Sequence, residues 1–305
     1  MRIAVIGAGA MGSLFGGRLA RAGNDVCLVD INQAHIDAIN RDGLHLDTDD
    51  GYQIVHDIRA GRASAFSEVA ELLLVFTKAP QTAAALWDAG HLAGPKSWVL
   101  TLQNGLGTGD RVAAALPSAS IAIGMTDVPA DLKGPGHVAS HGAGQVRLWA
   151  RSVEAGPGLA RIAEALRAAG FAVRADPQVL TAIWEKVLFN AVMNPVAALT
   201  RQTVGGMADH GDGRLLAETI LAEALMVARA SGVPVDEARV RGAIEHAYRE
   251  HGPHQPSMLQ DVLAGRATEI DAIAGQLVDR GAAHGIATPV LQTLTRLVRM
   301  INPAV

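Results

Sequence analysis

Three glycines near the N-terminus constrain the fold of this 305-residue chain more than any other feature. Gly7, Gly9 and Gly12 have the spacing Gly-x-Gly-x-x-Gly, with Ala10 and Met11 between the last two. An apolar run precedes them, and a helical pattern over 13–22 and a second apolar run follow. This context predicts a turn that binds the pyrophosphate of a dinucleotide at a helix N-terminus. The alternative is a tight strand-to-helix turn without a ligand.

The remaining pattern divides the chain into two parts. Strands are predicted at 2–6, 25–30, 71–77 and 98–102, with helices between them, and residues 121–150 suggest antiparallel strands that close the sheet. A helix at 158–169 and a last strand at 171–175 precede Pro177, after which about six helical segments follow. We therefore predict an α/β fold, with a Rossmann-type doubly wound sheet domain in residues 1–176 and an all-α domain in residues 177–305.

Composition excludes several classes of function. A formal net charge of −4 gives no basic field for nucleic acid or an anionic membrane. The longest apolar runs, such as 72–76, are too short to span a bilayer, and the glycine turn stands where a signal peptide would need its apolar core. We expect a cytoplasmic protein, monomeric or homodimeric. Cys27, the only cysteine, lies in a predicted buried strand, so neither an intrachain disulfide nor a reactive thiol is expected.

Asp30 bears on the choice of cofactor. It ends the second strand, 18 residues after Gly12, where a carboxylate accepts hydrogen bonds from the adenosine ribose and repels a 2′-phosphate. Residues 31–37 contain no Arg or Lys to hold that phosphate, so NAD(H) is favoured over NADP(H). The alternative is that Asp30 caps the helix that begins near Gln33.

Lys78 and Asn104 each follow a predicted parallel strand, and the carboxyl ends of such strands line the ligand crevice of a doubly wound sheet. Taken singly, a solvated loop lysine and an Asn-Gly turn would explain them. Together with the glycine turn they indicate one crevice.

A polar stripe interrupts the apolar segment 184–195. Lys186, Asn190 and Asn194 recur every four residues, which in a helix keeps them within a sector of about 80° along about 12 Å of axis. Burying such groups without partners costs roughly 1–3 kcal/mol each, so the stripe predicts a polar ligand. The alternative is a solvent-facing rim of an amphipathic helix.

Two later segments resemble helix starts. Ser257-Met-Leu-Gln260 has the form of a capping box, and Thr268-Glu-Ile-Asp271 is similar. Ser257 is either the N-cap or part of a cradle for a substrate carboxylate, and Glu269 is either a first-turn acid or a functional group.

No metal site is predicted. His251 and His254 flank a Gly-Pro turn without a matching acid or cysteine pattern. Asp47, Asp49 and Asp50 lack the closing glutamate of a calcium loop and are better explained by a hairpin turn.

These motifs together resemble the 2-dehydropantoate 2-reductase (ketopantoate reductase) family over the whole chain. The resemblance rests on the glycine turn, Lys78, Gln103-Asn104-Gly105, the polar stripe with Pro195, Ser257-Met-Leu-Gln-Asp and Thr268-Glu-Ile-Asp271. It implies that Lys186 is the catalytic lysine, that Glu269 binds the substrate hydroxyl or a catalytic water, and that Ser257 binds the carboxylate. It also implies that Asn104, Asn190 and Asn194 line the substrate site, with Asn104 reaching the cofactor as well, and that Lys78 lies between cofactor and substrate.

The expected reaction is reduction of the keto group of 2-dehydropantoate to pantoate, a step toward pantothenate and coenzyme A. Hydride transfer leaves negative charge on the keto oxygen, and Lys186 can supply both a cation and a proton there. Partial burial would lower the pKa of Lys186, whereas a nearby Glu269 would raise it. Alternatives are reduction of another branched 2-oxo acid and a dinucleotide-sensing protein without turnover. Many family members carry a basic residue where this chain has Asp30.

Overall fold

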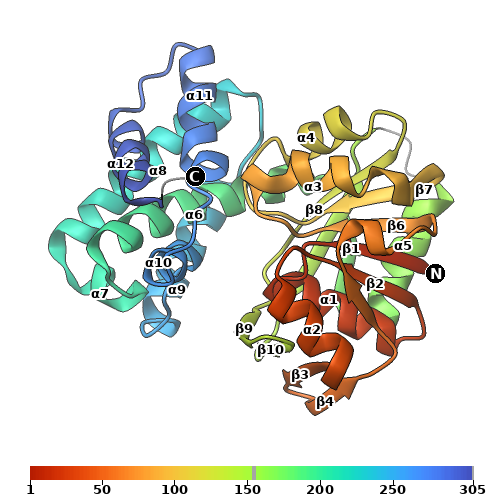
Figure 1. Ribbon diagram of the computed structural model, residues 1–305. Helices are drawn as coiled ribbons and strands as arrows, with labels where there is room; N and C mark the ends of the chain where they lie inside the picture. Colours follow the sequence, from red (N-terminus) through yellow and green to blue (C-terminus); the bar gives the residue numbers. More distant parts are fainter. Residues whose placement is uncertain (153–155, 304–305) are drawn as a thin grey trace. The chain divides into compact units, whose positions relative to one another are not determined.

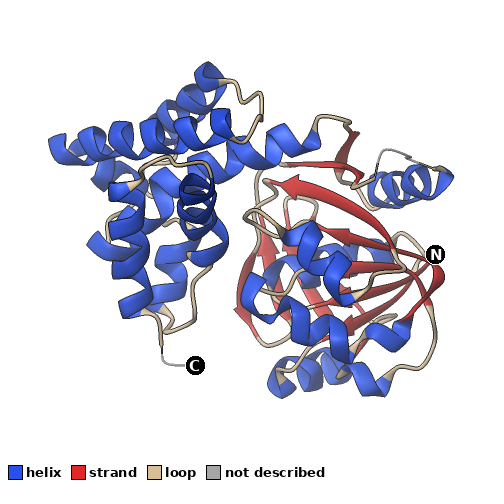
Figure 2. Cartoon of the chain, turned by 90° about the horizontal axis from the view of Figure 1, so that it is seen from above, coloured by secondary structure: helices blue, strands red, loops and turns tan. Residues whose placement is uncertain are grey.

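The computed structural model describes residues 1–152 and 156–303. The chain forms two compact units. The first, the sheet unit, comprises Met1–Gln103 and Thr108–Val179. The second, the helical unit, comprises Asn104–Gly107 and the chain from Leu180 onward. Figures 1 and 2 show that the strands belong to the first unit, so a mixed α/β fold is followed by a helical one, as the sequence predicts.

An eight-stranded sheet forms the centre of the sheet unit, in the order β12-β11-β8-β7-β6-β1-β2-β5. Its strands are β1 (Arg2–Ile6), β2 (Asp25–Val29), β5 (Arg59–Gly61), β6 (Ala70–Val75), β7 (Ala93–Thr101), β8 (Ser120–Thr126), β11 (Gln145–Ala150) and β12 (Ala172–Ala175). All neighbours pair in parallel except β8 with β11. The strand order reverses at β1, which lies between β6 and β2, so the ends of β1 and β6 form a topological switch point.

Helices cover both faces of this sheet (Figure 1). Ile3 and Val5 of β1 pack into a core with α1 (Ala10–Arg21), α2 (Gln33–Asp42) and α5 (Pro157–Ala168). Ala4 and Ile6 point the opposite way, into a core with α3 (Thr82–Asp88) and α4 (Thr108–Ala115). Alternate residues of one strand thus bury two separate layers, which explains why the central strands have nearly unbroken apolar sequences. Short 3₁₀ turns occupy η1 (Ala63–Ala65), η2 (Ala79–Gln81) and η3 (Gly90–Leu92).

A second, four-stranded sheet corrects one expectation. Its order is β4 (Gly51–Val55), β3 (Leu44–Thr48), β10 (His137–Ser140) and β9 (Asp131–Gly134). The segment 121–150 therefore does not simply close the main sheet: β8 is parallel to β7, whereas β10 leaves to pair with β3, and β9 pairs with β10. This arrangement buries Leu44, Leu46 and Val138 in the core that contains α1. The aspartates at 47–50 lie at the β3–β4 hairpin, as predicted.

The helical unit contains no strand in its described residues. It consists of α6 (Val179–Thr200), α7 (Val204–Asp209), α8 (Gly211–Ala230), α9 (Glu237–Glu250), α10 (Ser257–Leu263), the π-helical turn η4 (Asp271–Gly275), α11 (Gln276–Ala283) and α12 (Pro289–Ile301). The buried carboxylate of Glu223 on α8 accepts hydrogen bonds from Val290 N and Leu291 N, and so satisfies the N-terminus of α12. Among the helices described, none is long and apolar enough to cross a bilayer.

Candidate active site

The glycine turn lies at the switch point of the sheet and is closely packed. Gly7 has φ +93°, and a Cβ there would stand 2.7 Å from Thr77 N, at the end of β6. A Cβ at Gly12 would stand 1.9 Å from Gly7 O, whereas a Cβ at Gly9 would meet nothing within 4 Å. Ala10 and Met11 form the first turn of α1 directly behind the open side. This combination of a tight turn with one open glycine fits a pyrophosphate at the helix N-terminus.

Asp30 holds this turn against the end of β2. Its Oδ2 accepts a hydrogen bond from Ala8 N at 2.6 Å, and its Oδ1 accepts from Ile31 N and Asn32 N, each at 2.8 Å. The alternative that Asp30 caps the next helix is wrong, because Asn32 is the N-cap of α2 and accepts from His35 N. The carboxylate is thus fixed in place by backbone groups.

A buried histidine, which the sequence did not single out, supports the same turn. His35 is 2% exposed, and its Nδ1 accepts a hydrogen bond from Gly136 N at 2.9 Å. The proton therefore lies on Nε2, 3.0 Å from Ser13 Oγ, and Ser13 Oγ in turn donates to Ala8 O at 2.7 Å. Burial lowers the pKa of His35 and favours this neutral form. In the sequence, His35 falls on the apolar face of the helix α2, and this position indicates only that the side chain is buried.

Gln103 ties together the ends of β6 and β7. Its Nε2 donates to Thr77 O and to Thr82 Oγ1, and its Oε1 accepts from Thr101 Oγ1 at 2.9 Å. Half-buried Lys78 follows Thr77 directly and precedes η2. The predicted position of Lys78 beyond a parallel strand is therefore confirmed.

Asn104 lies within the helical unit together with Glu269. Asn104 Nδ2 is 3.4 Å from Glu269 Oε2, and Leu106 N donates to Ala272 O at 2.9 Å. Gly105 has φ +98°, and a Cβ there would stand 2.3 Å from Ala272 O, so only glycine permits this approach. Two predicted site residues 165 positions apart in the chain are thus in contact.

The two predicted capping boxes are wrong in detail. Pro256 is the N-cap of α10, and exposed Ser257 is the first helical residue, while Gln260 Nε2 donates to Gln255 O instead of closing a box. Thr268 Oγ1 accepts from Ile270 N in a local turn, and the helix begins only at Asp271. Because proline fixes the backbone ahead of α10, the Ser257 hydroxyl is not engaged in capping.

A π-helical turn follows Glu269. Gly275 N donates to Ile270 O at 2.9 Å, five residues earlier, and Glu269 O accepts from Ala272 N at 3.0 Å. Such turns are uncommon and often occur at functional sites. This turn carries the backbone oxygen that holds the Asn104 loop.

The polar stripe lies on α6, which is buried over most of its length. Lys186 and Asn190 are half-buried, and Asn194 is 3% exposed with no hydrogen-bond partner for its Nδ2. The alternative interpretation, that the stripe faces solvent, is therefore wrong for Asn194.

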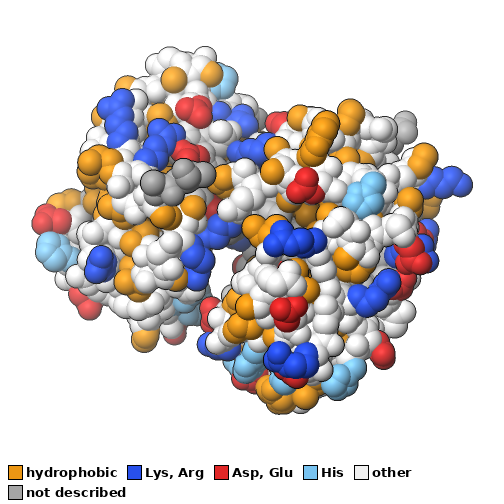
Figure 3. Space-filling model, viewed as in Figure 1, with side chains coloured by type: hydrophobic (Ala, Val, Ile, Leu, Met, Phe, Trp, Pro, Cys, Tyr) orange, Lys and Arg blue, Asp and Glu red, His pale blue; other side chains and the backbone are white. Residues whose placement is uncertain are grey.

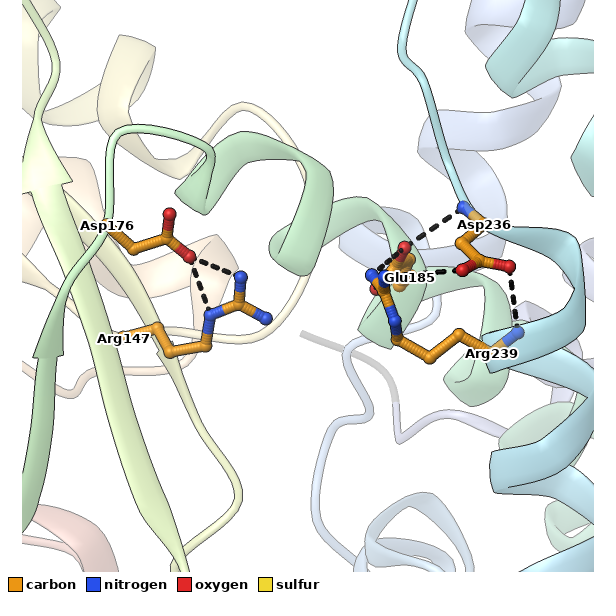
Figure 4. A network of polar contacts seen from close by, with 5 residues as sticks. All are labelled: Arg147, Asp176, Glu185, Asp236 and Arg239. Carbon is orange, nitrogen blue, oxygen red and sulfur yellow. Dashed lines mark hydrogen bonds and ion pairs between the residues drawn. The ribbon is translucent and has the colours of Figure 1, made fainter.

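An ion pair anchors α6 one residue before the stripe. Buried Glu185 accepts from Arg239 Nη1 at 2.8 Å and from Asp236 N at 3.0 Å, at the start of α9. Figure 4 shows these groups pointing toward one another, and shows a separate pair in the sheet unit between Arg147 and Asp176. Because Glu185 is tied to α9, the rotation of α6 about its own axis is restrained.

On the visible face of the sheet unit, acidic and basic side chains are interspersed (Figure 3). Within residues 1–152 and 156–303, no group of three His, Cys, Asp or Glu side chains is arranged to hold a metal ion.

Comparison with known proteins identifies the family. The sequence-family model described as "Ketopantoate reductase PanE/ApbA" matches residues 3–152. The family model described as "Ketopantoate reductase PanE/ApbA C terminal" matches residues 178–302. The chain is 32% identical over 299 residues to the 2-dehydropantoate 2-reductase of Streptococcus pyogenes serotype M3, covering 98% of this chain and 97% of that protein. For the enzyme of the same name from Halobacterium salinarum, identity is 33% over 302 residues, covering 98% of each chain. The chain belongs to the ketopantoate reductase family.

Solved structures agree with this membership. A PanE/ApbA family ketopantoate reductase from Ralstonia eutropha JMP134 has a TM-score of 0.91 at 32% identity, covering 99% of this chain and 98% of that one. The ternary structure of D-mandelate dehydrogenase with NADH and anilino(oxo)acetate has a TM-score of 0.93 at 30% identity, with the same coverage. As a ketopantoate reductase family member, the chain is an NAD(P)-dependent oxidoreductase.

Proposed function

We propose that this chain reduces the keto group of 2-dehydropantoate to give pantoate. The observation that carries the proposal is the stripe on α6, where a lysine, a half-buried amide and Asn194, whose Nδ2 has no hydrogen-bond partner, share one helix face. A polar acid supplies the hydrogen-bond partner that the fold leaves out. Family membership supports both the reaction and the substrate.

Each site residue then has a stated role. The glycine turn with Ala10 and Met11 binds the pyrophosphate, Asp30 accepts from the ribose hydroxyls, and Lys78 and Asn104 take part in cofactor binding. The reduced nicotinamide supplies a hydride to the keto carbon.

Lys186 donates a proton from Nζ to the former keto oxygen, so that a secondary alcohol forms. Asn190 and Asn194 orient the acid without adding charge, and Ser257 donates its hydroxyl to the carboxylate. Glu269, held by Asn104, accepts from the substrate hydroxyl or a catalytic water.

NADH is the proposed cofactor. The support is Asp30, whose carboxylate is fixed at the end of β2, where a 2′-phosphate would meet a negative charge. A cytoplasmic location and a monomeric or homodimeric state belong to the same proposal.

A second candidate substrate is another 2-oxo acid. The similarity to D-mandelate dehydrogenase, whose structure contains anilino(oxo)acetate, favours it, since that protein is about as similar to this chain as the ketopantoate reductases are. The polar stripe would orient any acid with an oxo group beside its carboxylate.

One assay tests the proposal. Oxidation of NADH and NADPH by purified protein is followed against a panel of 2-oxo acids, with Lys186→Ala and the exposed control Lys96→Ala beside the wild type. We expect the highest kcat/KM with 2-dehydropantoate and a loss of roughly 10²- to 10⁴-fold in Lys186→Ala only. Wild-type turnover in Lys186→Ala would overturn the mechanism, and cofactor binding without oxidation by any acid would favour a sensing role.

A further inference from the structure

The edge strand β5 brings an arginine to the end of β2. The two strands pair in parallel with Leu28 opposite Ala60 and Val29 opposite Gly61, and Asp30 N donates to Gly61 O at 3.0 Å. Arg62 follows directly, and its Nη2 donates to Ile31 O at 3.3 Å. A cation therefore stands beside Ile31, the residue after Asp30, although residues 31–37 contain none.

The strand that carries Arg62 is fixed on its outer edge as well. The side-chain amide of Asn40 on α2 donates to Ala60 O at 2.8 Å and accepts from Ala60 N at 3.0 Å. It thereby takes the place of a further strand at the open edge. The backbone before Arg62 is held from both sides, so the fold fixes the point from which the Arg62 side chain extends toward the end of β2.

The surroundings of Arg62 suit the adenosine end of a dinucleotide. Ile31 is 76% exposed although it is a large apolar side chain, and Arg62 is also exposed. Both follow directly on strand ends that pair with each other, next to Asp30, whose carboxylate is held by three backbone N–H groups. An adenine ring has two flat faces, one of which suits an aliphatic side chain and the other a planar guanidinium.

We propose that Arg62 and Ile31 form the adenosine subsite, with the Arg62 guanidinium stacked on the adenine and facing the position of a 2′-phosphate. Arg62 then offsets the repulsion between Asp30 and that phosphate, so the preference for NADH is moderate. From the sequence, only Asp30 is expected to decide between NADH and NADPH. This inference rests on the proposed function only in that the chain binds a nicotinamide dinucleotide.

Equilibrium binding tests it without the oxo acid. The Kd values for NADH and NADPH are measured by fluorescence titration for the wild type, Arg62→Ala and Arg62→Lys. Arg59→Ala is the matched control, because Arg59 lies on the same strand but pairs with Asp25 and Glu68 at the opposite end of the sheet. Thermal midpoints show whether each variant is folded.

We expect Arg62→Ala to weaken NADH binding about two- to fivefold through loss of stacking. It should weaken NADPH binding about tenfold to a hundredfold, because a charge-assisted contact is lost as well. Arg62→Lys should keep more of the NADPH affinity, and Arg59→Ala should change neither Kd. An equal change in both Kd values, or no change, would overturn this inference alone, whereas a wild type that bound neither cofactor would overturn the proposed function too.

Discussion

Removal of the buried imidazole of His35 should destabilise the sheet unit by a predictable amount. His35→Phe keeps an aromatic ring but deletes the acceptor of Gly136 N–H, which is buried, while Ser13 Oγ can still donate to Ala8 O. An unsatisfied buried donor costs about 1–3 kcal/mol. For a unit of this size the thermal midpoint should fall by roughly 2–12 °C. His35→Gln should lose less, because its amide offers both a donor and an acceptor.

The stability lost in His35→Phe should also depend on pH, and it should be larger at higher pH. Burial lowers the pKa of His35 below its usual 6.5, although Asp30 and the Ala8 carbonyl act in the opposite direction. Just below pH 6.5 the unfolded chain therefore binds a proton that the native chain does not. The stability contributed by neutral His35 is fully present above that pH and is lost as pH falls, with a slope of at most about 1.4 kcal/mol per pH unit.

Urea unfolding between about pH 5.5 and 8 measures both effects. The free energy of unfolding of the wild type should exceed that of His35→Phe most at the upper end, and the difference should shrink toward the lower end. The exposed His284→Gln serves as control for the titration of histidines in general. If the difference in unfolding free energy between the wild type and His35→Phe stayed constant with pH, His35 would not be neutral in the native state. If His35→Phe lost no stability at all, the hydrogen bond from Gly136 N would contribute nothing.

Three further predictions concern other buried groups. Asn194→Leu removes the partnerless amide, so urea unfolding should show equal or greater stability while the assay with oxo acid shows lost turnover. Burial alone would raise the pKa of Asp176, but hydrogen bonds from Arg147 and Gln178 N–H outweigh burial, so the pKa lies below its ordinary value of 3.8. Stability from this pair is present above that pH and lost below it. Arg147→Ala should cost about 3 kcal/mol and move acid unfolding to higher pH, as monitored by circular dichroism. Burial raises the pKa of the Cys27 thiol to about 11, so a thiol reagent should modify the unfolded chain but not the native one near neutral pH.

The features predicted from sequence are those that depend on near neighbours in the chain. The turn through Gly7 and Gly12 is specified within one βαβ unit, and its strands lie where the pattern placed them, while the helix α1 begins at Ala10, three residues earlier than predicted. The cap positions at Ser257 and Thr268 were missed because a serine or threonine makes local turns and caps with similar energies, and Pro256 decides between them in one case.

The features missed altogether depend on pairing between distant segments. β5 has three residues, too few for a periodic pattern, so nothing in the sequence places Arg62 beside Ile31. His35 likewise acquires its partners from another helix and from the β9–β10 turn, 101 residues away. The same holds for β10, which pairs with β3, and for β9, which pairs with β10, because neither pairing could be distinguished from an extension of the main sheet.

The polar groups around the site differ in one respect that bears on the ligand. Asp30 accepts three backbone hydrogen bonds, Gln103 is satisfied by threonines, and Glu185 is paired with Arg239. These groups hold the glycine turn, the ends of β6 and β7, and α6 in place, and their partners lie within the fold. Asn194 Nδ2, on the face that carries Lys186, is buried but has no hydrogen-bond partner. Because an amide nitrogen donates, an acceptor oxygen would satisfy Asn194 Nδ2, and a 2-oxo acid offers one in its carbonyl or carboxylate whereas an apolar ligand does not.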